Sequence, residues 1–187
     1  MAQDCDRFIS NIVLVGMPGA GKSTIGVILA KALGLGFVDT DILIQQETGK
    51  TLQGIIDASG YLALREIEEK VLSQAAFSRH VIATGGSAVY SPAAMSHLRA
   101  TGVIVFLRVE SAELERRVRD YHVRGIARRP DQSFHDLYCE RSELYELYAD
   151  IIIDCGERTM EDICQEISRE FHAVEGGRPE AGSSSVC

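Results

Sequence analysis

The stretch from Asn11 to Thr24, NIVLVGMPGAGKST, joins an apolar run to the pattern G-x-x-x-x-G-K-[ST]. The apolar run at 11–16 predicts a buried strand, and the residues at 22–33 predict a helix. A glycine-rich turn between a strand and a helix is the setting in which this pattern binds phosphate. Glycines let backbone N–H groups face the phosphate oxygens, and the start of the helix adds a partial positive charge.

The pattern also assigns a role to the polar residues of this turn. Lys22 is expected to reach the β- and γ-phosphates of a nucleotide, and Ser23 to place its hydroxyl on Mg²⁺. The alternative is a glycine-rich turn before an unrelated helix, but the flanking strand and helix favour nucleotide binding. The motif alone leaves the reaction open. The residues expected around the phosphates are Gly19, Ala20, Gly21, Lys22, Ser23 and Thr24.

Outward from this turn, short apolar runs alternate with stretches of helical period along the chain. Runs that are apolar throughout are typical of parallel strands covered on both faces, so we expect a three-layer, doubly wound α/β fold with five parallel strands. One domain is expected over 1–175, with a disordered, Gly- and Ser-rich tail at 176–187. Strands are expected at 11–16, 37–41, 80–86, 103–109 and 151–154, and helices at 22–33, 40–47, 61–79, 92–99, 111–119, 133–148 and 160–171.

The amino-acid composition indicates which classes of binding partner are unsuitable and which cellular location is expected. The 187 residues carry a net charge of −8, which argues against nucleic acid or an anionic membrane as the main partner. The longest apolar run has five residues, whereas a membrane helix needs about twenty, and the start of the chain does not resemble a signal peptide, so a cytoplasmic location is expected. No C-x-x-C pair occurs, so isolated buried thiols are expected at Cys5, Cys139, Cys155, Cys164 and Cys187.

Two carboxylates follow the second expected strand. Asp39 and Asp41 would lie at the carboxyl ends of the strands, where ligands of open parallel sheets collect. One is expected to face a metal ion and the other a substrate hydroxyl. The alternative is a helix N-cap, which explains one of the two. Arg65, in LREIE, is a further candidate for binding a ligand. The alternative is that it is a surface residue paired with Glu68 or Glu69.

A cluster of arginines stands out in this acidic chain. Six arginines lie between residues 116 and 130 against the single acidic residue Asp120. A charge run is usually a solvated helix face, but 121–130 has no sustained helical pattern. A mobile arginine loop that closes over a triphosphate is the functional interpretation. The stretch TGGS at 84–87 ends the third strand in glycines that permit close approach of a ligand.

Taken together, these motifs resemble those of the shikimate kinase family over about residues 11–170. That family shows G-x-x-G-x-G-K-[ST], Asp-x-Asp, F-R-x-x-E, T-G-G-G, an Arg-Pro-Leu lid and R-x-P-L-Y in this order. The resemblance implies a P-loop kinase fold with a mobile lid at about 117–132. The corresponding segments here are GMPGAGKST (16–24), DTD (39–41), LREIE (64–68), TGGS (84–87), VRGIARRPD (123–131) and RSELY (141–145).

The resemblance further implies the activity and the roles of particular residues. The reaction would be ATP-dependent phosphorylation of shikimate at a secondary hydroxyl, in aromatic amino acid biosynthesis, by a cytoplasmic monomer. Shikimate would be held by Asp41, Arg65, Gly86 and Arg141, and the catalytic residues would be Lys22, Asp41 and Arg124. Mg²⁺ would be oriented by Ser23 and Asp39, and the nucleotide would also contact Arg117, Arg124 and Arg158.

Three residues depart from the family pattern. Leu64 replaces an aromatic residue, Ser87 a glycine and Glu143 a proline, and the lid arginine could be Arg128 or Arg129 instead of Arg124. A kinase of the same architecture that acts on another small hydroxy acid therefore stays open. So does a nucleotide-binding module without turnover. Gluconate-kinase-like and nucleoside monophosphate kinase activities fit the residues less well.

Overall fold

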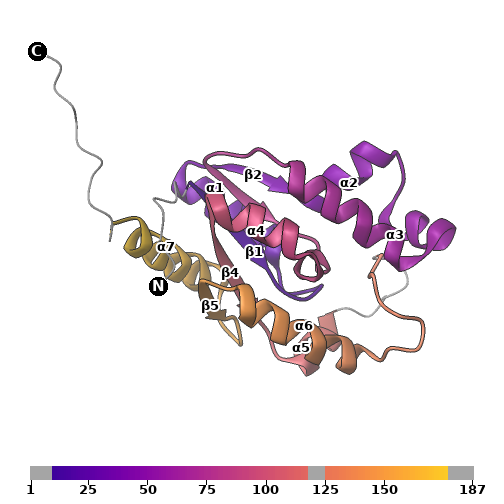
Figure 1. The fold of residues 1–187 in the computed structure, drawn as a ribbon. Helices are drawn as coiled ribbons and strands as arrows, with labels where there is room; N and C mark the ends of the chain where they lie inside the picture. The colour runs from indigo at the N-terminus through magenta and orange to yellow at the C-terminus, as the bar shows by residue number, and fades with distance from the viewer. Residues whose placement is uncertain (1–9, 118–124, 177–187) are drawn as a thin grey trace, which may run out of the picture.

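The structure, a computed structural model, describes residues 10–117 and 125–176 of the chain. Five parallel strands form one sheet in the order β2-β3-β1-β4-β5, so that β1 lies at its centre (Figure 1). The strands are β1 (Asn11–Val15), β2 (Gly36–Asp39), β3 (His80–Ala83), β4 (Gly102–Arg108) and β5 (Ile151–Asp154).

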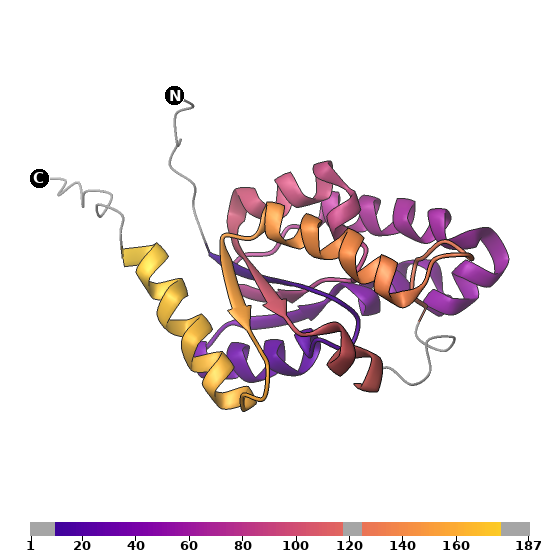
Figure 2. The same cartoon turned by 90° about the horizontal axis from the view of Figure 1, so that it is seen from below.

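Helices cover both faces of this sheet. In Figures 1 and 2, α1 and α7 lie against one face, and α3, α4 and α6 lie against the other. The expected three-layer α/β fold is therefore confirmed. The helices are α1 (Lys22–Leu33), α2 (Thr40–Thr48), α3 (Leu52–Gln74), α4 (Pro92–Thr101), α5 (Ser111–Arg117), α6 (Phe134–Tyr148) and α7 (Met160–Gly176), with a 3₁₀ turn η1 (Ala88–Tyr90).

The central strands are apolar because water reaches neither of their faces. Every residue of β1 is buried, and in β4 only Arg108 at the carboxyl end is partly exposed. Such strands need no alternation of polar and apolar residues. They form the main core together with the inner faces of the helices. Among the described residues, none of the helices is both long enough and apolar enough to cross a membrane.

Helix α3 differs most from the sequence expectation. It begins at Leu52 rather than residue 61 and ends at Gln74 rather than residue 79. Gly60 lies inside it with non-helical angles, φ 84° and ψ 167°. The kink breaks the register of the apolar pattern, so the periodicity does not predict the first part of the helix.

The C-terminal end and one cysteine also correct the expectations. Helix α7 continues to Gly176, so the tail does not begin there; residues 177–187 lie outside the described residues. The apolar pattern ends at Phe171 because the last turns of α7 are exposed. Cys139 is exposed, since α6 turns Leu137 and Arg141 inward and leaves Cys139 on its outer side. The expectation of a buried thiol is correct for Cys155 and Cys164; Cys5 and Cys187 lie outside the described residues.

Candidate functional site

The glycine-rich turn after β1 lies at the carboxyl edge of the sheet. Gly16, Gly19 and Gly21 have φ values of 146°, 86° and 92°, which only glycine adopts readily. The turn curls around the Lys22 ammonium, which donates to the carbonyl oxygens of Gly16 at 2.7 Å and Met17 at 3.0 Å. A cation thus stands at the start of α1, where the N-terminus of the helix already favours anions.

Burial makes this ammonium a weaker base than an ordinary lysine. Removal from water lowers the pKa of Lys22 to about 8, and the nearby carboxylate of Asp41 opposes that change. The lysine is still mostly protonated at neutral pH. Its two hydrogen bonds go to neutral carbonyls, so an incoming anion would be a stronger partner than those it holds.

Asp39 joins the end of β2 to the start of α1. Its Oδ2 accepts a hydrogen bond from Ser23 Oγ at 2.6 Å, and its Oδ1 accepts the backbone N–H of Asp41 at 3.0 Å as the N-cap of α2. The N-cap interpretation is therefore confirmed for Asp39, and its expected role at a metal ion stays a prediction. A hydroxyl beside a carboxylate supplies the hard oxygen ligands that Mg²⁺ accepts, with phosphates and water completing its shell. Within 10–117 and 125–176, no three or more His, Cys, Asp or Glu side chains are arranged so that they could hold a metal ion by themselves.

Two glycines after β3 let charged groups crowd together. A Cβ on Gly85 would lie 2.7 Å from Oδ1 of Asp41 and would also overlap Oε1 of Glu68. A Cβ on Gly86 would lie 2.8 Å from Nη1 of Arg141. Because neither glycine has a side chain, two carboxylates and a guanidinium can lie against the same turn.

Arg65 and Arg141 converge on one oxygen, although they lie 76 positions apart in the sequence. The carbonyl of Ala127 accepts Nη2 of Arg141 at 2.8 Å and Nη2 of Arg65 at 3.3 Å. Nε of each arginine is buried and has no hydrogen-bond partner among the described residues. Arg141 is only 1% exposed, so its charge is fully removed from water. Two guanidinium groups with spare donors form a site that suits a carboxylate.

Arg141 and the Ala127 segment line a cavity beside the glycine-rich turn, whereas Arg65 lines a neighbouring groove with Tyr90; Glu68 and Ser87 border both. The cavity has a volume of about 240 Å³, and its lining includes Ser23, Asp41, Gly86, Ser87, Ala127 and Arg141. Another, more open groove of about 500 Å³ is lined by Gly19, Gly21, Lys22, Ser23, Thr24, Arg117 and Met160. Gly19 and Ser23 border both the cavity and this open groove. A ligand in each would therefore meet its neighbour at the turn.

Burial also raises the pKa values of two carboxyl groups at the cavity. The pKa of Asp41 is raised by desolvation and by the negative charge of Asp39, against the opposing effect of Lys22. Desolvation raises the pKa of Glu68 to about 7, although a hydrogen bond from Ser87 lowers it. Oε1 of Glu68 is buried and has no hydrogen-bond partner among the described residues. Both groups are stronger bases than exposed carboxylates.

Several candidate residues lie elsewhere or carry other contacts. Ala20 is buried and donates its N–H to the Met17 carbonyl. Arg117 lines the open groove, donates to Gly19 O at 3.5 Å and pairs with Glu113. Arg158 is not brought to that groove, because it pairs with Glu166 at 2.5 Å on the outside of α7.

The lid arginines divide between described and undescribed parts of the chain. Arg124, the expected lid arginine, lies outside the described residues. Arg128 donates to the Gln132 carbonyl at 2.5 Å, and Arg129 pairs with Glu140 at 3.2 Å. Neither lines the cavity or the open groove.

Sequence reasoning missed two groups that shape the cavity. The sequence predicts Glu68 only as a surface partner of Arg65, but Glu68 is 3% exposed and accepts a short hydrogen bond from Ser87 Oγ. The sequence signal for a functional role of Glu68 is that it matches the glutamate of the F-R-x-x-E motif, three residues after Arg65. Tyr145, which ends the RSELY stretch, is buried and donates its hydroxyl to Gly86 O at 2.6 Å.

A family model and individual known proteins similar to this chain all point to the same family. The family model described as shikimate kinase matches residues 18–172. The shikimate kinase of Mycobacterium avium is 39% identical over 170 residues, which cover 89% of this chain and 96% of that protein. The shikimate kinase of Mycobacterium tuberculosis is 41% identical over 150 residues, covering 78% of this chain and 84% of that protein.

A solved structure agrees with these relatives. The shikimate kinase from Acinetobacter baumannii in complex with shikimate superposes with a TM-score of 0.78 at 29% identity. The match covers 90% of this chain and 96% of that one.

Proposed function

The chain belongs to the shikimate kinase family, and on this premise we propose that it transfers the γ-phosphoryl group of ATP to a secondary hydroxyl of shikimate, giving shikimate 3-phosphate and ADP. The observation that carries the proposal is the convergence of Arg65 and Arg141 on one carbonyl oxygen beside Asp41 and the glycine-rich turn. Such a site takes a small acid that also carries hydroxyl groups. The related structure from Acinetobacter baumannii, which is a complex with shikimate, supports this acid as the substrate.

In this proposal the residues of the turn hold the nucleotide. The backbone of 16–24 and the Lys22 ammonium bind the β- and γ-phosphates, and Ser23 and Asp39 hold Mg²⁺. Bound there, Mg²⁺ would neutralise charge on the phosphates. Arg117 is the candidate contact for the base of the nucleotide. Arg124 is the candidate for charge stabilisation from the lid, and Arg158 remains a prediction from the resemblance.

The acceptor lies in the cavity lined by Asp41 and Arg141, on the other side of Gly19 and Ser23 from the open groove that holds the nucleotide. The arginine pair binds its carboxylate, and Gly86 lets the ring approach the backbone. Asp41 accepts the proton of the attacking hydroxyl, a task for which its raised pKa suits it better than an ordinary aspartate. In phosphoryl transfer, positioning and charge stabilisation supply most of the rate enhancement. The cytoplasmic location and the monomeric state remain predictions from the sequence.

A coupled assay of ADP release against a panel of hydroxylated carboxylic acids tests the substrate. We expect shikimate to stimulate ADP formation more than any other acid in the panel. Leu64 and Ser87 line the cavity, whereas Glu143 is exposed on α6. The first two departures can therefore change acceptor preference. Stimulation by a different acid, with none by shikimate, would overturn the choice of substrate.

A matched pair of variants tests catalysis itself. Asp41→Asn should lower kcat by a factor of a hundred or more, the usual scale for a lost general base, and leave ATP affinity nearly intact. Asp57→Asn, an exposed carboxylate on α3 that bonds Gln53, serves as the control and should retain wild-type kinetics. ATP binding without turnover in the wild-type chain would favour the nucleotide-binding module.

A further inference from the structure

Arg65 packs against two aromatic rings, and none of the acidic side chains in the described part of the chain forms an ion pair with it. The central guanidinium carbon lies 3.5 Å from the centre of the Tyr90 ring and 5.2 Å from that of Tyr61. Its hydrogen bond to Ala127 O is long, at 3.3 Å, and Nε has no hydrogen-bond partner among the described residues. Of the two rings, that of Tyr90 is the closer to this cation, and it packs against the plane of the guanidinium.

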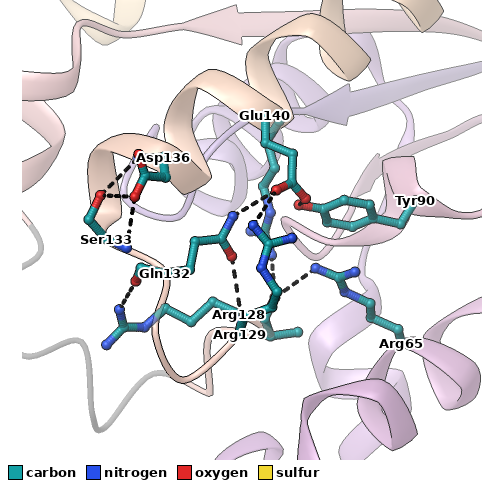
Figure 3. Close-up of polar contacts among 10 residues, drawn as sticks. Arg65, Tyr90, Arg128, Arg129, Gln132, Ser133, Asp136 and Glu140 are labelled. Atoms are coloured by element: carbon teal, nitrogen blue, oxygen red, sulfur yellow. Dashed lines mark hydrogen bonds and ion pairs between the residues drawn. The ribbon is translucent and has the colours of Figure 1, made fainter.

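Tyr90 is itself held at its far end. It ends η1, directly after the TGGS turn, and its hydroxyl donates to Oε1 of Glu140 on α6 at 2.6 Å. Figure 3 shows the Tyr90 ring pointing from η1 to Glu140, with the Arg65 side chain reaching the same region. The ring is therefore fixed by its hydroxyl as well as by packing.

Glu140 connects this ring to residues 125–132, the described part of the expected lid. Its Oε2 accepts Nε2 of Gln132 at 2.7 Å and pairs with Nη2 of Arg129 at 3.2 Å (Figure 3). The backbone N–H of Arg129 also donates to Gln132 Oε1, at 3.4 Å. One carboxylate thus joins η1, α6 and the segment whose Ala127 carbonyl binds both arginines.

A ring beneath a guanidinium leaves the donors at its edge available. Cation–π attraction acts on the face of the group, whereas a carboxylate binds in its plane through two N–H groups. An acidic partner such as aspartate would instead occupy those donors and compete with a substrate carboxylate. An aromatic partner orients the cation without neutralising it.

We propose that Tyr90 is a positioning residue that holds Arg65 for the carboxylate of the acceptor, and that Glu140 keeps the Tyr90 ring in place. The inference rests on the proposed function for the identity of the acceptor, but the contact between the two side chains does not depend on it. Neither Tyr90 nor Glu140 belongs to the motifs that carried the family resemblance.

Steady-state kinetics with shikimate test the role of the ring. Tyr90→Leu should raise the KM for shikimate about tenfold, equivalent to about 1.4 kcal/mol, with kcat and the KM for ATP within twofold of wild type. Tyr61→Leu should have a smaller effect because its ring is farther from the cation. Tyr138→Leu, a half-buried tyrosine on α6 whose ring is not one of the two over Arg65, is the matched control. A KM for shikimate within twofold of wild type in Tyr90→Leu would overturn the proposal.

A second pair of variants tests the anchor and does not require removal of the ring. Tyr90→Phe should raise the KM for shikimate about threefold, and this effect should disappear in a Glu140→Ala background. Equal threefold effects in both backgrounds would show that Glu140 does not act through the ring. The same comparison decides the matter if Tyr90→Leu fails to fold.

Urea unfolding separates this inference from the proposed function. A double-mutant cycle of Tyr90→Leu and Arg65→Leu should show coupling of about fivefold in the unfolding equilibrium constant, without any substrate. Coupling below twofold would refute the contact. If wild-type protein does not phosphorylate shikimate but the coupling is found, the proposed substrate is wrong and the contact between ring and cation stands.

Discussion

Glu68→Gln is the substitution that most directly tests the electrostatics of the cavity. Glu68 is 3% exposed, and burial raises its pKa from an ordinary 4.5 to about 7. The folded protein therefore holds this proton more tightly than the unfolded chain does. The stabilisation that comes from this tighter proton binding is fully present below pH 4.5 and is lost as the pH rises through 7. The free energy of unfolding therefore falls across that interval. At 1.36 kcal/mol per pKa unit, the loss is about 3 kcal/mol.

Urea unfolding of the wild type and two variants from pH 4.5 to pH 8 measures this loss. Glu68→Gln keeps the shape of the side chain and an oxygen for the Ser87 hydroxyl, but it cannot titrate. Its stability should therefore fall about 3 kcal/mol less than that of the wild type over the interval. Glu69→Gln, at the exposed neighbouring glutamate, should follow the wild type. If Glu68→Gln also follows the wild type within 1 kcal/mol, the pKa of Glu68 is not raised by burial and the reasoning fails.

Three further outcomes follow from individual contacts. Tyr145→Phe removes the donor to Gly86 O, so unfolding should become easier by about 1–2 kcal/mol in urea melts; an unchanged midpoint would contradict the bond. Gly86→Ala places a methyl group 2.8 Å from Nη1 of the buried Arg141, so the KM for shikimate should rise at least tenfold at constant KM for ATP, and normal kinetics would mean that this turn does not contact the acceptor site. Because the pKa of Lys22 is lowered to about 8, calorimetric titration without metal should show ATP binding weakening severalfold between pH 7 and 9, and less so in Lys22→Arg; a flat wild-type profile would refute a titrating ammonium.

The glycine-rich turn and the strand pattern could be predicted because their signals are local. An apolar strand, three glycines and a Lys-Ser pair within fourteen residues require no knowledge of distant parts of the chain. The same holds for α1, whose bounds at Lys22 and Leu33 coincide with those expected. Steric limits on the backbone and burial of the sheet act over a few neighbouring residues and leave a readable pattern.

The first part of α3 and the exposure of Cys139 could not be read in this way. Gly60 interrupts the period of α3, so the pattern before it falls on a different face of the helix. Cys139 faces outward because of how α6 is rotated against the sheet, and a thiol gives no sign of this by itself. The orientation of a helix about its own axis depends on what packs against it.

The amino-acid sequence by itself determined that a nucleotide-binding turn follows a buried strand. That turn is built from consecutive residues, and its glycines adopt backbone angles that other residues rarely adopt. Only the tertiary structure decided that Arg65 and Arg141 share the Ala127 carbonyl and that Glu68 is buried. An arginine three residues before a glutamate on a helix fits a solvated surface pair equally well. The choice between surface and cavity is made by the segment that packs over the helix, because burial changes both the pKa of a carboxyl group and the partners that a guanidinium can reach.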